Sequence, residues 1–235
     1  MDRIKRIVKK TPVVRDLARA TMRQLAMRKA SSFDSAGYWE SRYRDGRSSG
    51  AGSYNRLAHF KADTLNRFVE EHSVRSVMEF GSGDGSQLRL ASYPSYVGVD
   101  VSQTAIELTR RDYAGDPTKK FVHADRLEPD ASADLTLSLD VVYHLVEDHV
   151  FEAYMARLFD TSRRYVIVYS SNEERRADSV HVRHRRFTDW VERNRPEFRQ
   201  IGFVKNLYPE DPRDLDNTSF ADFYFFERAL EASQA

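Results

Sequence analysis

The fold of this chain is decided by residues 77–85, VMEFGSGDG, together with residues 96–100, YVGVD. The first stretch is an apolar strand that runs into a glycine-rich turn, and the second is an apolar strand that ends in the carboxylate of Asp100. Asp100 follows Gly81 by 19 positions, which places the acid at the tip of the neighbouring strand, in reach of a ribose held over the turn. The two stretches therefore predict a site for a cofactor that contains adenosine.

The glycine turn also distinguishes between cofactor classes. Gly81, Gly83 and Gly85 form the pattern G-x-G-x-G, whereas the dinucleotide fingerprint is G-x-G-x-x-G and aims a helix N-terminus at a pyrophosphate. Two carboxylates, Glu79 and Asp84, lie before and inside the turn. They would repel a pyrophosphate and attract an amino group or a sulfonium cation. S-adenosylmethionine carries both of these groups and no phosphate, so it is the predicted cofactor.

With these residues the chain resembles the class I S-adenosylmethionine-dependent methyltransferases. The first motif of that family, an acid followed by G-x-G-x-G, is matched by Glu79 and the three glycines. The second motif, an acid at the end of the second strand, is matched by Asp100, and the third, an acid after the third strand, by Asp125. The resemblance implies that Asp125 lies close to the adenine, and we expect Val101 and Leu139 to contact the cofactor as well.

Strands and helices alternate through the central region, which is typical of a parallel sheet with helices on both faces. We therefore expect an α/β fold, with a Rossmann-like, seven-stranded, mostly parallel sheet and a helical N-terminal arm. The family resemblance covers about residues 55–228 and implies that the last strand is antiparallel. Strands are expected near 75–80, 96–100, 120–123, 134–139, 164–170, 200–207 and 220–228, and helices near 56–71, 84–91, 102–113 and 147–160.

Charge divides the chain into an arm and a body. Residues 1–30 hold ten Lys and Arg against two Asp, a net charge of +8, while the remainder carries −7. Such an arm suits a helix packed on the domain with a solvated basic face, or contact with an anionic membrane surface, RNA or an acidic substrate. We expect residues 1–54 to form this arm and an aromatic, glycine-rich lid, and residues 55–235 to form the methyltransferase domain.

Composition excludes several classes of protein. The chain has no cysteine, which excludes disulfides and thiolate metal sites, and it has no apolar run long enough to span a bilayer. The N-terminus lacks the apolar core of a signal peptide, so a cytoplasmic location is expected. Nothing in the sequence specifies an oligomer.

The fourth expected strand delivers residues 140–145, DVVYHL, to the edge of the sheet where ligands bind in open α/β folds. Methyl transfer from a sulfonium is a direct displacement in which the protein aligns the reacting atoms, and an alcohol acceptor must also lose a proton. Histidine suits that task near neutral pH. We therefore predict His144 as general base, with Asp140 or Glu147 to orient it or the substrate, and Tyr143 as a further catalytic candidate. The alternative is that His144 caps the next helix or makes a structural hydrogen bond.

Basic and aromatic side chains near the same edge are candidates for substrate binding. His181, His184 and Arg185 follow the fifth expected strand, and Tyr43 lies in the lid segment. Arginine forks suit carboxylates, phosphates or the adjacent hydroxyls of sugars, and the alternative is a solvated basic loop.

A divalent cation such as Mg²⁺ is a weaker candidate cofactor. Oxygen-bearing side chains suit such a cation, but they show no clear ligand spacing, and we predict no metal site. The side chains in question are Asp125, Asp140, His144 and Asp148.

Missing motifs narrow the reaction. There is no N-P-P-Y or D-P-P-Y run after the fourth strand, as adenine and glutamine N-methyltransferases use, and no cysteine for pyrimidine C5-methylation. Residues 38–57 and 183–190 are similar to bacterial methyltransferases of glycan biosynthesis, including the sugar O-methyltransferases of methylated mycobacterial polysaccharides. We therefore expect O-methylation of a saccharide hydroxyl. The alternatives are an RNA methyltransferase that uses the basic arm and a non-catalytic scaffold that binds the cofactor.

Overall fold

The computed structural model describes residues 33–175 and 179–229. The chain divides into two units, Met1–Asp34 and Ser35–Ala235. Residues 35–54, which the sequence groups with the arm, fall in the same unit as the sheet. The expected helical arm, residues 1–30, lies outside the described residues.

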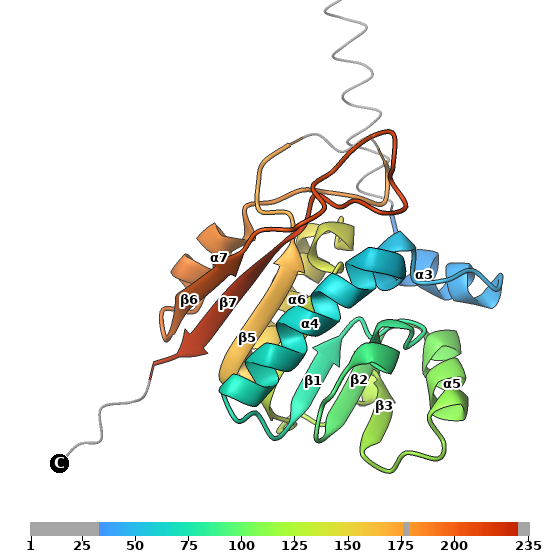
Figure 1. Cartoon of the computed structure of the whole chain (residues 1–235), viewed down its shortest axis with the longest axis horizontal. Coiled ribbons are helices and arrows are strands. Elements are labelled where there is room, and N and C mark those ends of the chain that lie inside the picture. The colour runs from blue at the N-terminus through green and yellow to red at the C-terminus, as the bar shows by residue number, and fades with distance from the viewer. Residues whose placement is uncertain (1–32, 176–178, 230–235) are drawn as a thin grey trace, which may run out of the picture. The chain divides into compact units, whose positions relative to one another are not determined.

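The second unit is built on one seven-stranded sheet (Figure 1). Its strands are β1 (Val77–Phe80), β2 (Tyr96–Asp100), β3 (Lys119–His123), β4 (Ala133–Leu139), β5 (Ser162–Ser170), β6 (Phe198–Val204) and β7 (Asp222–Arg228). Their order is β3-β2-β1-β4-β5-β7-β6. The pairs from β3 to β5 are parallel, and β7 is antiparallel to both β5 and β6. This arrangement confirms the predicted mostly parallel sheet and its antiparallel last strand.

The strand order fixes where a ligand can bind. After β3 the chain crosses to the other side of β1, so β1 lies between β2 and β4. Ligands of open α/β sheets bind at such a switch point, outside the carboxyl ends of the strands. The registers bring Phe80 level with Val99 and Ser138, so the chain leaves β1, β2 and β4 at one edge. That edge collects Gly81, Asp100 and Asp140.

Helices cover both faces of the sheet, as the alternating pattern predicts (Figure 1). The helices are α3 (Ser35–Arg44), α4 (Asn55–Glu71), α5 (Gln103–Asp112), α6 (Asp148–Asp160) and α7 (Phe187–Asn194). On one face, Leu65 and Phe68 of α4 join a core with side chains of β1, β4 and β5. On the other, Phe159 of α6 and Trp190 of α7 belong to a second core.

Three local elements differ from the sequence prediction. The helix expected over 84–91 is wrong in extent, because only a 3₁₀ turn, η2 (Gln87–Leu90), forms there. Asp84 Oδ1 accepts a hydrogen bond from Ser86 N at 3.0 Å, and such local bonds compete with helix formation. Helix α3 forms in the expected lid segment, where its mostly polar face hides the helical pattern, and α7 forms where no helix was predicted.

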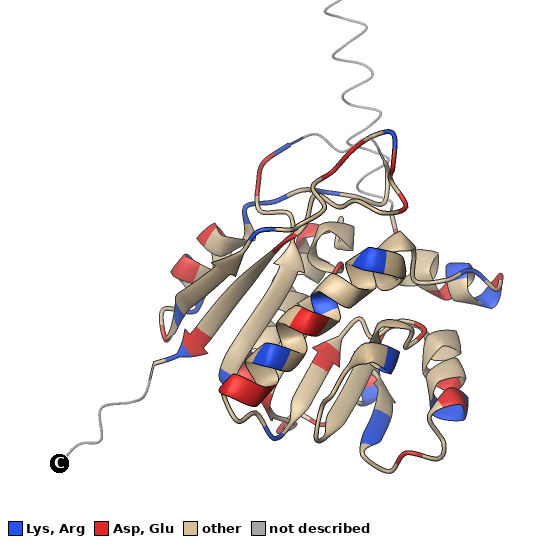
Figure 2. Ribbon diagram, viewed as in Figure 1, with Lys and Arg blue, Asp and Glu red and all other residues tan. Residues whose placement is uncertain are grey.

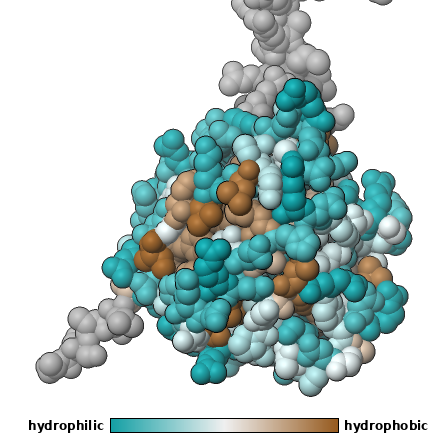
Figure 3. Space-filling model, viewed as in Figure 1, coloured by the Kyte–Doolittle hydropathy of each residue, from teal (hydrophilic) through white to brown (hydrophobic). Residues whose placement is uncertain are grey.

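The surface mixes charges and small apolar patches. Acidic and basic residues alternate along the ribbon in Figure 2, and α4 carries both signs. Figure 3 shows that this face is mostly hydrophilic, with apolar residues in separate patches. Within the two described ranges, no helix is long and apolar enough to cross a membrane.

The packing of α4 on the sheet can be tested by Leu65→Ala. Leu65 is fully buried in the first core, so its truncation leaves a cavity that the surroundings fill only in part. We expect the free energy of unfolding to fall by about 2–5 kcal/mol. Urea unfolding followed by circular dichroism measures this loss. Arg67→Ala, at an exposed position of the same helix, is the control and should change it by less than about 0.5 kcal/mol; equal losses would contradict the packing.

Candidate active site

A cavity of about 410 Å³ lies over the carboxyl ends of β1, β2 and β4. Its walls come from residues at or just beyond these strand ends and from α3, α4 and α6. The structure brings together five of the predicted cofactor-binding residues on this wall. These are Glu79, Gly81, Asp100, Val101 and Leu139.

The glycine turn is packed closely by other residues of the chain, and only part of it faces the cavity. Gly83 has a φ of +56°, and a Cβ on it would clash with Ser49 Oγ and lie 2.8 Å from the hydroxyl of Tyr43. Gly83 and Gly85 do not line the cavity themselves. The turn therefore needs glycine at Gly83 because residues of the N-terminal segment pack directly on it.

Asp100 ties this turn to the second strand. Its Oδ2 accepts a hydrogen bond from Gly83 N at 2.8 Å, and its Oδ1 accepts one from Ser102 N at 2.9 Å. Burial raises the pKa of Asp100 above its usual value. A carboxylate can accept about four hydrogen bonds, so these two donors leave capacity for ligand hydroxyls at the cavity wall.

Glu79 is a buried carboxyl group on the same wall. It is 5% exposed, and its Oε2 accepts a hydrogen bond from the Tyr96 hydroxyl at 2.7 Å. Burial raises the pKa of Glu79 to about 7. The group therefore changes its charge near neutral pH, inside the cavity that the sequence assigns to a cationic cofactor.

Two buried polar atoms on the cavity wall have no hydrogen-bond partner among residues 33–175 and 179–229. They are Ser82 Oγ and Gln87 Oε1. Buried polar groups in native proteins are nearly always hydrogen-bonded, so these two atoms fit a polar ligand at this end of the cavity. Val101, Ala124 and Leu127 add apolar side chains to the wall, which suit a flat ring.

Asp125 lies between two residues of the apolar part of the wall. The cavity is lined by Ala124 and Leu127 on either side of it but not by Asp125. Its side chain is 90% exposed and lies 3.7 Å from His123 Nδ1. A role of Asp125 near the adenine stays a prediction.

A second cavity, of about 250 Å³, adjoins the first. Its wall includes Tyr143, Glu210 and Phe220. Both cavities are lined by Ser49, Ser53, Asp140 and His144. The side chains predicted for catalysis therefore stand where the two cavities meet.

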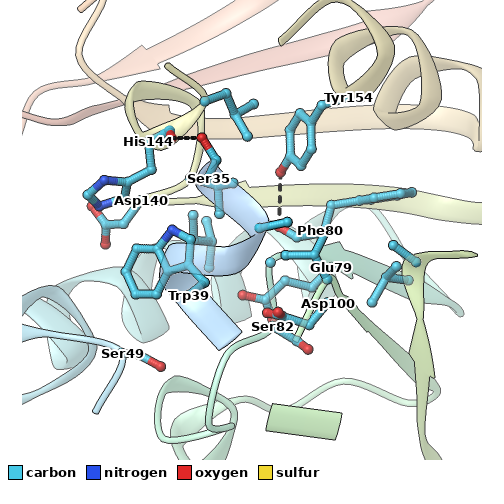
Figure 4. A pocket seen from close by; sticks show the side chains of 18 of the residues that line it. Ser35, Trp39, Ser49, Glu79, Phe80, Ser82, Asp100, Asp140, His144 and Tyr154 are labelled. Carbon is cyan, nitrogen blue, oxygen red and sulfur yellow. Dashed lines mark hydrogen bonds between the residues drawn. The ribbon is translucent and has the colours of Figure 1, made fainter. Parts of the chain in front are cut away.

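His144 is held in one tautomer at this junction. Its Nδ1 lies 2.8 Å from the carbonyl oxygen of His181, which can only accept, so Nδ1 donates and Nε2 keeps its lone pair. Burial lowers the pKa of His144 to about 4, so the ring is neutral at physiological pH. The ring of Trp39 stands edge-on at 5.0 Å. Figure 4 shows Asp140 and His144 on one side of Trp39, and Glu79, Ser82 and Asp100 on the other.

Asp140 is paired with a lysine that the sequence analysis missed. Lys61 Nζ lies 2.7 Å from Asp140 Oδ2, and the Tyr143 hydroxyl donates to Oδ1 at 3.0 Å. Lys61 is 1% exposed and also lines the first cavity. A signal was present, because Lys61 shares one helical face with Leu57 and Leu65, where a charged side chain must find a buried partner.

Residues 35–54, which we call the strap, cover both cavities. Ser35 N donates to Glu147 Oε1 at 2.9 Å, and Ser35 Oγ donates to the carbonyl of His144 (Figure 4). Glu40 Oε2 accepts a hydrogen bond from Ser102 Oγ at 2.7 Å. Ser49 N donates to the carboxylate of Asp84 at 2.8 Å. The strap is thus fastened by three carboxylates.

The predicted substrate-binding residues divide into two groups. Tyr43 lines the first cavity, and its hydroxyl lies 3.0 Å from Ser49 Oγ. The His181 ring stacks on the His144 ring at 5.4 Å without lining either cavity. His184 and Arg185 are buried and also lie outside both walls. The His184 ring lies 2.8 Å from Ser171 Oγ, and Arg185 donates to the carbonyl of Val146 at 2.9 Å.

The parts of the chain that the structure describes contain no side-chain cluster suited to a metal ion. No group of three or more His, Cys, Asp or Glu side chains there could hold a metal ion. Asp148, one of the candidate ligands, is paired instead with Arg183 at 2.9 Å and Arg185 at 3.2 Å.

Glu79 predicts a pH-dependent affinity for S-adenosylmethionine. With a pKa of about 7, its ionised fraction rises about tenfold between pH 6 and pH 8, and only the ionised form attracts a cation. We expect calorimetry to show affinity rising by up to about tenfold over this range. The control is Glu79→Gln, whose smaller change reports the amino group of the cofactor itself. An identical pH profile in both proteins would contradict the role of Glu79.

Comparison with known proteins shows what the domain and its fold resemble. Residues 78–165 match the family model described as a methyltransferase domain. No curated protein matches the sequence. Among solved structures, magnesium protoporphyrin IX methyltransferase from Synechocystis PCC 6803, solved with bound S-adenosylmethionine, has a TM-score of 0.60 at 15% identity, covering 84% of this chain and 99% of that one.

Two further structures share the fold. The N-methyltransferase NodS from Bradyrhizobium japonicum WM9 has a TM-score of 0.57 at 12% identity, covering 74% of this chain and 98% of that one. A candidate RNA methyltransferase from Pyrococcus horikoshii has a TM-score of 0.51 at 16% identity, covering 73% and 83%. The TM-scores show a common fold. Sequence identities this low do not identify the methyl acceptor of this protein. The match over residues 78–165 and the shared fold agree with the methyltransferase-like domain that the motifs predict.

Proposed function

We propose that the protein is an O-methyltransferase that methylates a hydroxyl of an oligosaccharide or polysaccharide precursor. The observation that carries the proposal is the place of His144, which lines both cavities and has Nδ1 committed to the carbonyl of His181. A neutral imidazole fixed in this tautomer presents Nε2 as a proton acceptor between cofactor and acceptor. The second cavity is then the acceptor site.

The first cavity supplies suitable partners for the cofactor. Bound S-adenosylmethionine supplies a methyl group activated by its positively charged sulfur. Asp100 has acceptor capacity for ribose hydroxyls, and ionised Glu79 attracts positive charge. Val101 and Leu139 offer apolar contact for the adenine ring. Ser82 Oγ and Gln87 Oε1 would gain hydrogen-bond partners that the described residues do not give them.

The chain's own part in the chemistry is alignment and proton removal. The acceptor hydroxyl must lose its proton as its oxygen attacks, and Nε2 of His144 takes that proton. Burial raises the pKa of the Tyr143 hydroxyl well above its usual value, so Tyr143 stays protonated and donates to Asp140. Asp140 thereby stays in place beside His144 as a hydrogen-bond acceptor.

The charges of the second cavity support a neutral acceptor. The charged side chains on its described wall are the carboxylates Asp140 and Glu210. Arg175 is held against Glu210 at 2.8 Å and does not line the cavity. Because Lys61 balances Asp140 and Arg175 balances Glu210, the described wall is close to neutral and offers a phosphate or carboxylate no unpaired cation, whereas hydroxyls can donate to both carboxylates. This balance of charge favours a sugar over an RNA backbone, and we place the reaction in the cytoplasm.

The experiment that tests this function is transfer of a labelled methyl group from S-adenosylmethionine into an extract of the source cells. The product is divided by ribonuclease, protease and glycosidase treatment. Label in material that only glycosidase releases supports the sugar acceptor. Release of the label by ribonuclease would instead support methylation of RNA. In that case residues 1–30 bind the nucleic acid, and turnover falls steeply with salt. Cofactor binding without transfer to any fraction would indicate a scaffold.

Replacement of the base tests the proposed proton transfer. We expect His144→Ala to lower turnover by about 10²–10⁴-fold, because the acceptor hydroxyl loses its proton acceptor. Affinity for S-adenosylmethionine, measured by calorimetry, should stay within about threefold, since the cofactor keeps its main partners. His59→Ala, at an exposed position of α4, is the control and should keep full turnover. Normal turnover in His144→Ala would remove His144 from the mechanism.

The low pKa of His144 also shapes the pH profile. The imidazole accepts a proton only when neutral, so turnover should be lost as pH falls through about 4, not through the usual histidine value near 6.5. At saturating S-adenosylmethionine, kcat should therefore stay flat between pH 5 and pH 7 apart from changes that Glu79→Gln abolishes. An acidic limb near pH 6.5 that persists in Glu79→Gln would show that the base is more exposed than the structure indicates.

A further inference from the structure

The pair between Lys61 and Asp140 is not used by the proton transfer described above. Lys61 lies on α4 with 1% of its surface exposed, and its ammonium donates to Asp140 Oδ2 at 2.7 Å. A buried ion pair is costly to form and often gives less stability than apolar side chains would. Its position on the wall of the cofactor cavity therefore suggests a role in the site.

The backbone of Asp140 is held in an unusual conformation. Its φ is +59°, in the left-handed region that non-glycine residues seldom adopt. Gly52 of the strap approaches so closely that a Cβ on it would lie 2.6 Å from Asp140 Oδ2. Conformations of this kind persist only where the surroundings enforce them, and they gather at functional sites. Lys61, Tyr143 and Gly52 all lie against the carboxylate of this residue.

The part of the chain that the structure describes gives the carboxylate of Asp140 one donor on each oxygen. Lys61 binds Oδ2 and Tyr143 binds Oδ1, so about two acceptor positions remain. Asp140 lines both cavities, whereas Lys61 lines only the first. An effect of Lys61 on the acceptor therefore has to pass through Asp140.

We propose that Lys61 is a positioning residue, whose ammonium fixes the Asp140 carboxylate where it accepts a hydrogen bond from the acceptor and aligns the reacting hydroxyl with His144. This inference rests on the proposed function, because it requires an acceptor that carries a hydroxyl group. Lys61 also balances the charge of Asp140, so that the junction of the cavities stays close to neutral before the acceptor enters.

A double-mutant cycle tests the coupling. We expect Lys61→Met and Asp140→Asn each to lower kcat/KM by about 100-fold, the loss that a displacement of about 1 Å can cause. The double variant should be no worse than the poorer single variant, whereas independent effects would multiply to about 10⁴-fold. The acceptor in each assay is the extract fraction that takes up label with the wild-type protein. Multiplicative losses would overturn the proposal.

Cofactor affinity separates this role from direct contact between Lys61 and the cofactor. Calorimetry with S-adenosylmethionine should give a Kd for Lys61→Met within about threefold of the wild-type value. A rise of tenfold or more would mean that Lys61 binds the cofactor and would overturn the proposal. Lys119→Met is the matched control, because Lys119 is a lysine with 10% side-chain exposure, paired with Asp116 at 3.7 Å and outside both cavities. It should keep full activity.

A readout that needs no acceptor keeps this inference distinct from the proposed function. A crystal structure of Lys61→Met should show the Asp140 side chain displaced and its bond with Tyr143 altered. An unchanged Asp140 would overturn the proposal even if the sugar acceptor is correct. If a single variant does not fold because one charge is left buried, the double variant removes both charges. Its full turnover would count against any role of the pair, and lost turnover with intact cofactor affinity would support it.

Discussion

The carboxylate of Asp100 is the contact on which the rest of the site depends. It accepts hydrogen bonds from the backbone of Gly83 and of Ser102, so it joins the turn after β1 to the start of α5. Ser102 then caps α5 and donates through its hydroxyl to Glu40, which fixes α3 of the strap. From α3, Ser35 reaches Glu147 and the carbonyl of His144. A continuous set of hydrogen bonds therefore links the predicted ribose site to the predicted base.

Carboxylates hold this region through hydrogen bonds with neutral partners rather than through ion pairs. Hydrogen bonds from Thr104 and Ser102 lower the pKa of Glu40, so its charge persists at physiological pH. Asp84 is bound in the same way by Ser49 and by the hydroxyl of Tyr54. Such bonds to a charged acceptor are shorter and stronger than neutral ones, which lets a short polar segment stay ordered without a large apolar face.

Much of the fold was accessible from the sequence because its signals are local. Each strand is a short apolar run between turn residues, and the spacing from Gly81 to Asp100 fixed which strands are neighbours. The missed features depend on contacts between distant segments. In the sequence, Lys61 is a single charged residue on an apolar helical face. Its partner, Asp140, lies 79 positions away. Folding buries His184 and Arg185 against Ser171 and Val146, which no local pattern reveals, and their role in substrate binding stays a prediction.

The strap forms a wall of both cavities, since Ser49 and Ser53 line each of them. The strap is therefore a wall that the two cavities have in common. A displacement of the strap would remove one wall from both cavities in the same movement. A long carbohydrate chain that is methylated repeatedly would have to be released, or held elsewhere, at every exchange of cofactor.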